Sequence, residues 1–230
     1  MSELVEFPET TWGMLCGIRA QEAAERRSGM EKLCLRYRAP IARYARTAWA
    51  RGDADAEDLT QEFFLWLLGS DALTRFAPER GSFRAYLKGV LRNFGRNRAK
   101  AERAQKRGGG HATVSLIDDD VADDRAADAE AAFDRAWAAE VMSRAVERTR
   151  ARLGDARAEQ WEIFESYDLA SGAKPTYAEL AARLGLKESD VRNALFAVRE
   201  KVRAEVRAEL CDTVATPRDL EAEWRSVVGA

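Results

Sequence analysis

The sequence contains few of the residues from which metal sites and disulfide frameworks are built, with three cysteines and one histidine among 230 residues. The cysteines, Cys16, Cys34 and Cys211, are odd in number and far apart, and the single histidine is His111. A disulfide framework needs paired cysteines, and a zinc site needs several Cys or His ligands at short spacing. We therefore expect reduced, buried cysteines, no metal and no other cofactor.

Long apolar runs are also missing. No apolar run reaches the length needed to span a membrane. The first ten residues, MSELVEFPET, are too acidic and too polar for a signal peptide. No His, Cys or carboxylate constellation has the pattern of a catalytic site. These absences favour a cytoplasmic binding protein without a membrane partner and without enzymatic activity.

Strand signals are absent as well, because no run of β-branched residues alternates with polar ones. Ala, Arg, Glu and Leu dominate, and nearly every long segment has helical periodicity. The sequence therefore predicts an all-α fold, and the 46% hydrophobic content is enough for two small cores.

The order of helical and polar stretches divides the chain into parts. The glycines at 108–110 and the aspartates after them leave few large apolar groups, so that this stretch cannot fold by itself. Near the end, Thr216, Pro217 and Asp219 have the order of a helix start. We expect a first helical domain over 1–107, an acidic flexible linker over 108–125, a second helical domain over 126–210 and a C-terminal helical extension over 211–230.

The most informative segment spans 82–107, which separates into two faces when it is wound as a helix capped by Ser82. One face is apolar and comprises Phe83, Leu87, Val90, Leu91 and Phe94. The other is a basic ridge of residues spaced four apart, Arg84, Lys88, Arg92, Arg96 and Lys100. A row of like charges is tolerated more easily against a polyanion, and nucleic acid is the commonest polyanion in a cell. A solvated face on a core helix is the alternative, although such faces usually mix both signs.

Aromatic residues border this ridge. Tyr86 and Asn93 lie where the apolar stripe meets the basic ridge. Unstacked bases are held on aromatic side chains, so this border suits contact with an exposed base of single-stranded DNA. A simple packing role is the alternative.

The preceding helix, predicted over 54–68, is acidic instead. Its expected core stripe is Leu59, Phe63, Trp66 and Leu67. The remaining residues combine acids with side chains that a single buried face does not explain, namely Asp55, Asp58, Gln61, Glu62, Phe64 and Leu65. Carboxylates beside exposed apolar groups indicate a protein partner, while acids near a helix start can also simply stabilise its dipole.

In the second domain, a short helix over 177–184, a turn at Gly185 and Leu186 and a longer helix from Glu188 form a helix-turn-helix pattern. In such motifs the start of the second helix enters the major groove. Arg192 and Asn193 are the candidates for reading bases. The other candidate DNA contacts are Lys187, Ser189, Asp190, Phe196, Arg199 and Arg203. Arg199 and Arg203 suit phosphate, and an ordinary helical hairpin is the alternative.

Three stretches, in this order, resemble an extracytoplasmic-function (ECF) sigma factor of bacterial RNA polymerase. They are DAEDLTQEFFLWLL, FRAYLKGVLRNFGRNRAK and YAELAARLGLKESDVRNALFAVREKVRAEL. The N-terminal TTWGMLCGIRA and the sequence QKRGGG are similar to a subgroup of these factors.

The resemblance implies partners for each surface. The acidic helix, with Asp58, Gln61 and Glu62, would bind core RNA polymerase. The basic helix from Arg84 to Arg98 would open the promoter and hold the minus-ten element, including the melted non-template strand. The residues from Arg192 to Arg199 would read the duplex of the minus-thirty-five element. The acidic linker would thread a basic channel of the polymerase.

Two alternatives stay open. One is a self-sufficient helix-turn-helix regulator whose first domain senses a ligand or dimerises. The other is a helical signalling adaptor, which a basic ridge covered by the acidic linker would favour. For control of a factor of this type, we consider an anti-sigma protein, a protein kinase that modifies a residue such as Thr60, or the terminal extensions of the chain.

Overall fold

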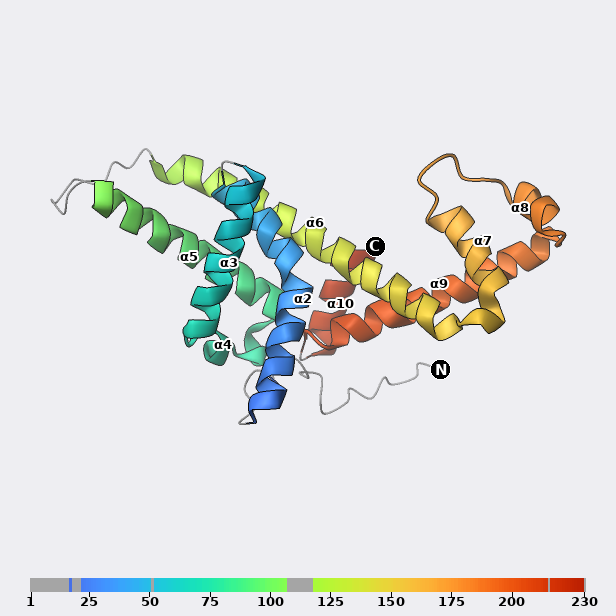
Figure 1. Cartoon of the computed structure of the whole chain (residues 1–230), viewed down its shortest axis with the longest axis horizontal. Coiled ribbons are helices and arrows are strands. Elements are labelled where there is room, and N and C mark those ends of the chain that lie inside the picture. The colour runs from blue at the N-terminus through green and yellow to red at the C-terminus, as the bar shows by residue number, and fades with distance from the viewer. Residues whose placement is uncertain (1–16, 18–21, 51, 107–117, 215, 230) are drawn as a thin grey trace. The chain divides into compact units, whose positions relative to one another are not determined.

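The computed structural model describes residue 17 and residues 22–50, 52–106, 118–214 and 216–229. Every regular element within these ranges is a helix, as the composition predicts (Figure 1). None of the helices described has both the length and the apolarity to cross a membrane. The N-terminal stretch TTWGMLCGIRA lies almost entirely outside the described residues, as do the glycines of QKRGGG.

The helices divide into two compact units, which we describe separately. The first unit comprises the chain up to Glu140 and from Leu210 onward, and the second comprises Val141–Glu209. The elements are α2 (Ala23–Ala48), α3 (Asp53–Gly69), α4 (Ala72–Arg75), the 3-10 turn η1 (Pro78–Arg80), α5 (Phe83–Lys106), α6 (Asp118–Leu153), the 3-10 turn η2 (Asp155–Arg157), α7 (Ala158–Asp168), α8 (Tyr177–Leu184), α9 (Glu188–Cys211) and α10 (Pro217–Val228).

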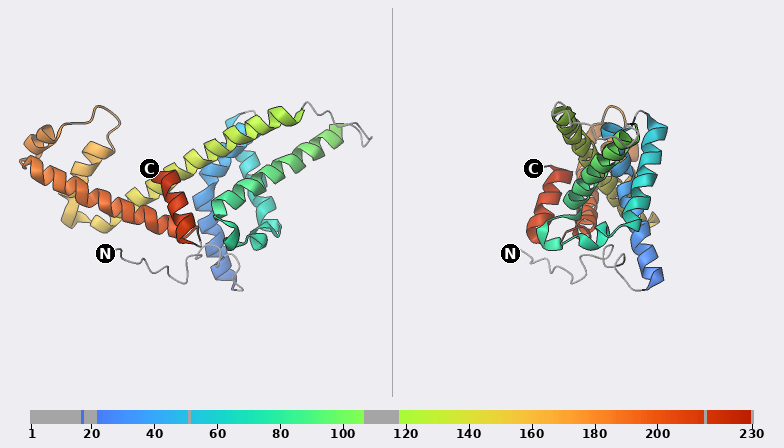
Figure 2. Two further views of the ribbon diagram at one scale, coloured as in Figure 1. Left: turned by 180° about the vertical axis from the view of Figure 1, so that it is seen from behind. Right: turned by 90° about the vertical axis from the view of Figure 1, so that its left-hand side faces the viewer.

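The core of the first unit is aromatic and lies where α2, α3, α5 and α6 meet. Tyr37 of α2 is stacked on Trp137 of α6 with ring centroids 4.8 Å apart, and it meets Phe83 of α5 edge-on at 5.4 Å. Helix α3 lies beside α2 and α5 (Figures 1 and 2), where Phe63 packs edge-on against Phe94 at 5.3 Å. The apolar stripe predicted for α5 is confirmed, because all five of its residues are buried.

Helix α6 corrects the predicted domain boundary. The helix begins at Asp118, so that residues 118–125 of the predicted flexible linker have a helical backbone. Phe133 and Trp137, expected in the second domain, are fully buried in the first unit instead. The alanine-rich sequence around them favours a continuous helix, and burying a Trp and a Phe against Tyr37 stabilises its attachment to α2.

The C-terminal helix α10 also belongs to the first unit. Its predicted start is confirmed, because the Thr216 hydroxyl accepts a hydrogen bond from the Asp219 N–H at 3.1 Å and Pro217 takes the first helical position. Leu220 is buried, and the Thr213 carbonyl just before α10 accepts the Phe83 N–H at 3.4 Å. The chain end is therefore packed against the start of α5.

The second unit contains α7, α8, most of α9 and the last part of α6. The two helices and the glycine turn of the predicted helix-turn-helix lie at the expected residues, and Gly185 has the left-handed φ of 69°. A capping box starts α8, in which the Thr176 N–H donates to Glu179 at 2.7 Å and the Glu179 N–H donates to the Thr176 hydroxyl at 3.2 Å. The Thr176 N–H, and the Thr176 hydroxyl 3.0 Å from the same carboxylate, lower the pKa of the Glu179 carboxyl.

Candidate functional site

The outward face of α3 carries a stripe of acidic, amide and apolar side chains. Leu59, Phe63 and Leu67 are buried, as predicted, which turns the opposite face outward. The outward residues recur three or four apart and are Asp58, Gln61, Glu62, Leu65 and Leu68. We call them the α3 stripe. Leu65 of this stripe is 73% exposed, and exposed apolar residues that adjoin one another mark interaction surfaces.

Trp66 departs from the predicted core stripe. Its residue surface is 38% exposed, although the ring still lies 5.3 Å from that of Phe94. Trp66 and Leu68 therefore extend the exposed apolar area, although the sequence pattern placed Trp66 in the core and assigned no role to Leu68. Phe64 is half-buried with its ring 6.2 Å from Phe63, and Asp55 is half-buried too.

The acids of α3 differ in what they contact. Glu57 and Asp53 form ion pairs with Arg38 and Arg46 of α2, which join these two helices. Glu62 pairs with Arg98 of α5 at 2.8 Å. No ion pair joins Asp58 to a described residue, and the residue is exposed. Asp58 is thus the acid of the α3 stripe best placed to meet a cation of a partner.

Thr60 cannot serve as the kinase target suggested by its position beside these acids. It is 1% exposed, and its hydroxyl donates to the Ala56 carbonyl at 2.7 Å inside the same helix. A kinase needs the hydroxyl in solution, so modification of Thr60 would require α3 to unfold. The sequence pattern missed this because Thr60 follows Leu59 and turns toward the same buried side.

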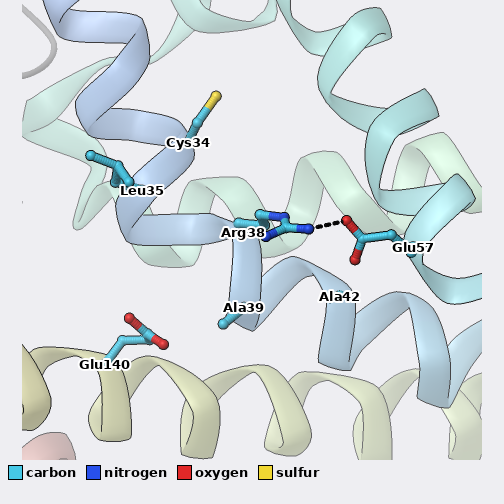
Figure 3. Close-up of a pocket in the computed structure, with 7 residues that line it drawn as sticks. All are labelled: Cys34, Leu35, Arg38, Ala39, Ala42, Glu57 and Glu140. Atoms are coloured by element: carbon cyan, nitrogen blue, oxygen red, sulfur yellow. Dashed lines mark hydrogen bonds and ion pairs between the residues drawn. The ribbon is translucent and has the colours of Figure 1, made fainter. Parts of the chain in front are cut away.

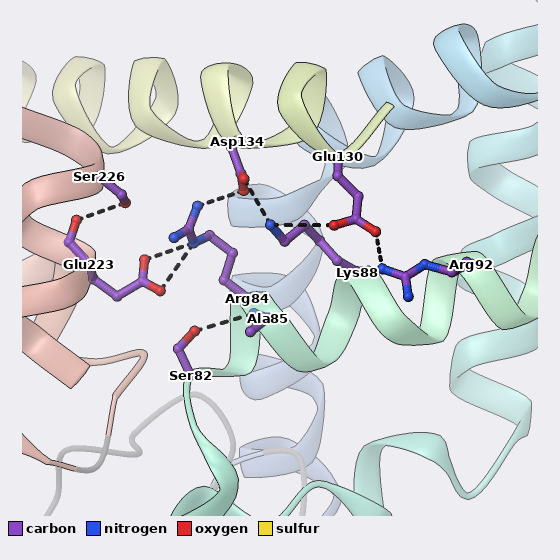
Figure 4. Close-up of polar contacts among 9 residues, drawn as sticks. All are labelled: Ser82, Arg84, Ala85, Lys88, Arg92, Glu130, Asp134, Glu223 and Ser226. Carbon is purple, nitrogen blue, oxygen red and sulfur yellow. Dashed lines mark hydrogen bonds and ion pairs between the residues drawn. The ribbon is translucent and has the colours of Figure 1, made fainter. Parts of the chain in front are cut away.

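The N-terminal half of the basic ridge is held by carboxylates of the same chain (Figure 4). Arg84 pairs with Asp134 of α6 at 2.6 Å and with Glu223 of α10 at 2.8 Å. Lys88 pairs with Asp134 at 2.8 Å and lies 3.9 Å from Glu130. The Arg84 and Lys88 side chains are only 13% and 17% exposed. Glu130 also pairs with Arg92, whose side chain is 41% exposed.

The C-terminal half of the ridge is open. Asn93, Arg96 and Lys100 are exposed, and no ion pair joins Arg96 or Lys100 to a described residue. We call these three residues the open end of α5. On the apolar side, the Trp49 ring lies 5.6 Å from Phe94 and supports this end of the helix.

Charges of both signs surround buried Tyr44, next to the boundary between the two halves. Burial, together with the nearby Glu130 carboxylate, raises the pKa of the Tyr44 hydroxyl to about 12, while Arg92 and Arg96 act in the opposite direction. Tyr44 therefore stays neutral at any physiological pH.

Tyr86 is anchored within the first unit. Its hydroxyl donates to the Ala72 carbonyl at 2.6 Å, and its ring lies 5.2 Å from Phe76. This arrangement supports the packing alternative for Tyr86. Asn93, the other border residue, is exposed and can reach a ligand.

On α9, the residues expected to enter the major groove form an exposed surface at the helix start. Lys187, Ser189, Arg192 and Asn193 are exposed, and Phe196 is 65% exposed. Asp190 is a structural residue here. Its carboxylate accepts the Lys187 N–H at 3.2 Å, which satisfies one of the unpaired donors at the helix start.

Arg199 and Arg203, the two expected phosphate contacts, are paired within the chain. Arg199 donates two hydrogen bonds to Asp168 at 2.8 and 3.0 Å and lies over the Tyr167 ring at 5.6 Å. The hydrogen bond to Asp168 raises the pKa of Arg199. Arg203 pairs with Glu200 one turn before it. Arg199 thus joins α7 to α9.

An open hollow of about 440 Å³ lies on the first unit between α2, α3 and α6 (Figure 3). Apart from the Arg38–Glu57 ion pair and Glu140, its lining is small or apolar, with Cys34 and Leu35 on one side. Burial raises the pKa of the Cys34 thiol. Among the described residues no group of His, Cys, Asp and Glu is arranged to hold a metal ion.

The carboxylates that cover the ridge are the functional residues that the sequence pattern missed. Glu130 and Asp134 are four residues apart, the same spacing as Arg84, Lys88 and Arg92. This equal spacing is the one available signal, since two helices with matching charge periods can pair along their length. No such matching charge spacing in the sequence indicates that Glu223 contacts α5.

Residues 33–105 match the family model of sigma-70 region 2. The match covers most of α2, all of α3 and nearly all of α5, and therefore both the α3 stripe and the basic ridge. No curated protein and no solved structure matches the chain.

Proposed function

We propose that the chain is a sigma factor of the sigma-70 family and of the ECF type, which acts in transcription initiation without enzymatic activity and directs core RNA polymerase to specific promoters. In sigma factors, region 2 binds core polymerase and minus-ten promoter DNA. Core polymerase and the chromosome share the cytoplasm, so the proposed activity belongs there.

One observation carries the proposal: the matched region presents two chemically different exposed surfaces on neighbouring helices. The α3 stripe combines Asp58, an acid that no ion pair joins to another described residue, with the exposed Leu65. The open end of α5 is cationic and polar. An acidic and apolar stripe suits a protein partner, and exposed cations suit phosphate. The chain can therefore bind both partners at once.

For the polymerase contact, we assign the α3 stripe. Apolar side chains that leave water give affinity, and the surrounding carboxylates select a basic partner surface. Glu62 lies at the edge of this stripe and forms an ion pair with Arg98 of α5. That ion pair links the polymerase-binding helix to the DNA-binding helix.

For the minus-ten element, we assign Asn93, Arg96 and Lys100, since their side chains are exposed. Two cations spaced one helical turn apart can contact successive phosphates, and Asn93 can bond an unpaired base. A basic ridge covered by the acidic linker would favour the helical adaptor alternative. Acids of α6 and α10 cover Arg84 and Lys88, whereas Arg96 and Lys100 are exposed.

For the minus-thirty-five element, we assign the start of α9. Arg192 can bond guanine and Asn193 can bond adenine, each through two hydrogen bonds. The support here is the exposed start of α9 behind the glycine turn, together with the resemblance described above, because the family match ends at residue 105.

The proposal is tested by transcribing fragmented genomic DNA with core polymerase, with and without the chain, and sequencing the 5′ ends of the transcripts. We expect starts that depend on the chain and share two upstream elements. No chain-dependent starts would contradict the proposal. A shared inverted repeat, bound by the chain without polymerase, would instead identify the self-sufficient regulator.

A matched pair of variants tests the polymerase surface. We expect Asp58→Ala with Leu65→Ala to weaken polymerase binding at least about tenfold, typical of truncating interface contacts worth more than 1 kcal/mol. The control Glu79→Ala with Leu169→Ala removes one exposed acid and one exposed leucine elsewhere and should bind normally. Equal affinity of both variants would remove the α3 stripe from the interface.

A further inference from the structure

Three acids that lie outside the matched region neutralise the first half of the basic ridge. Glu130 and Asp134 come from α6 and Glu223 comes from α10, whereas the family match ends at residue 105. We call these three residues the acidic clamp. Figure 4 shows their carboxylates directed at Arg84, Lys88 and Arg92 from two separate helices.

We propose that the acidic clamp competes with DNA for α5, so that nucleic acid reaches Arg84 only when α10 is displaced. This inference rests on the proposed DNA-binding function of α5. It adds an autoinhibitory contact, in which carboxylates of the chain occupy the places that phosphates would take.

The hydrogen-bond donors of Arg84 explain the competition. The Nε and Nη1 atoms both point to carboxylates, the first to Glu223 and the second to Asp134. A phosphate binds arginine through the same planar set of N–H donors. Because the Arg84 side chain is only 13% exposed, a DNA strand has no path to these donors while both acids are in place.

The closed arrangement is stabilised by more than charge. The Glu223 side chain is 4% exposed, and an ionised carboxylate withdrawn from water needs a cation beside it. Leu220, one turn earlier on α10, is 1% exposed, and the Thr213 carbonyl accepts the Phe83 N–H. Releasing α10 therefore exposes apolar surface as well as breaking ion pairs.

The open end of α5 gives DNA a first binding site. Arg96 and Lys100 lie on the same ridge, beyond Arg92, and no described acid pairs with them. A strand held there lies beside the clamp and can replace its carboxylates with phosphates one after another. Binding of DNA and docking of α10 are thus expected to weaken each other by the same factor.

Two charge-matched variants of the full chain test the clamp. The clamp variant combines Glu223→Gln with Asp134→Asn, and the control combines Glu221→Gln with Asp128→Asn, both of which are exposed acids on the same two helices. Each variant removes two negative charges. The probe is a fluorescein-labelled single-stranded DNA of mixed sequence, and its anisotropy is followed as KCl is raised.

We expect the clamp variant to bind the probe about fivefold or more tighter than the control, at the low end of typical coupling between sites. Its plot of log affinity against log salt should steepen by about 0.7 for each phosphate contact regained. Equal affinity and equal slope for the two variants would overturn the proposal.

The wild-type chain provides a second readout that no substitution can disturb. Amide hydrogen exchange of residues 217–228 should become faster when the probe DNA is added, because DNA displaces α10. Unchanged or increased protection of α10 with DNA bound would overturn the clamp.

Failure of the clamp is distinguishable from failure of the proposed function. If Arg96→Ala with Lys100→Ala lowers affinity for the probe while the clamp variant behaves like its control, only the clamp is wrong. If neither Arg96 and Lys100 nor the clamp affects binding, α5 is not a DNA-binding helix, and both proposals fall.

Discussion

Arg84 and Arg96 belong to the same row of basic residues on α5, yet they have opposite surroundings, because each four-residue step turns the row by about 40° around the helix. Arg84 is 13% exposed and is shared between two carboxylates. Arg96 is exposed, and no ion pair joins it to a described residue. A row of equally spaced cations can therefore have two roles. Some of its residues hold helices together through ion pairs, and others remain available to a ligand.

The second unit repeats the contrast on α9. Arg199 is held by Asp168 through two hydrogen bonds, while Arg192 is exposed two turns nearer the helix start. In both units the cation that is paired within the chain joins two helices. The exposed cation lies where a partner can approach.

The largest effect is expected from Arg84→Ala. This substitution leaves Glu223, which is 3% exposed, without the arginine beside it, and removing one partner of a buried pair costs about 3 to 5 kcal/mol of folding free energy. Arg96→Ala should change the free energy of unfolding by less than about 0.5 kcal/mol. Urea denaturation followed by circular dichroism measures the free energy of unfolding of each variant. Equal losses for the two variants would contradict a structural role of Arg84 that Arg96 lacks.

The next effect concerns how the open end of α5 is supported. A Cβ added at Gly95 would clash with the Trp49 indole ring, so Gly95→Ala should destabilise the chain by about 1 to 3 kcal/mol. Gly89→Ala is the control on the same helix, because nothing lies within 4 Å of its added Cβ. We expect that variant to be up to about 1 kcal/mol more stable, since alanine favours helix. Equal thermal denaturation of the two variants would contradict the packing of Trp49 on α5.

The contrast on α9 is tested at a promoter bound by the chain with core polymerase. Arg192→Ala should weaken promoter binding by about 1 to 3 kcal/mol when the base pair that Arg192 contacts is present. At promoters in which that base pair is altered, the same substitution should have little effect. Arg199→Ala should lower the thermal stability of the chain and weaken all promoters alike. A base-specific loss for Arg199→Ala, or a uniform loss for Arg192→Ala, would reverse the two roles.

The smallest effect is a pH dependence at the start of α8. Hydrogen bonds from Thr176 lower the pKa of Glu179, so the carboxylate stabilises the folded state above the unfolded pKa, about 4.3. That contribution is lost as the pH falls through the lower folded value. We expect Glu179→Gln to reduce the melting temperature slightly at neutral pH and to have no effect in acid. A difference that is independent of pH would exclude the ionised capping box.

Local signals predicted much of the fold. The apolar stripe of α5, the Thr216 cap and the glycine turn at Gly185 each depend on neighbouring residues, and each is confirmed. The helical bounds of α3, α8 and the start of α9 follow from the same kind of pattern.

The remaining features depend on contacts between distant segments. Arg84 meets Asp134 and Glu223 across 50 and 139 residues of sequence. Periodicity identifies a charged face but does not show what covers it. For the same reason, the predicted second domain over 126–210 includes Trp137, which packs on Tyr37 in the first unit instead, since a tryptophan on a long helix carries no sign of which unit buries it.

The central claim is that the exposed surfaces of α3 and α5 let this chain bring core polymerase to a promoter and open it. Permanganate reactivity of thymines around a mapped start site measures this opening directly. We expect reactive thymines only when core polymerase and the chain are both present, and a strong loss of reactivity with Arg96→Ala and Lys100→Ala. Opening that occurs without the chain, or that never occurs with it, would contradict the account.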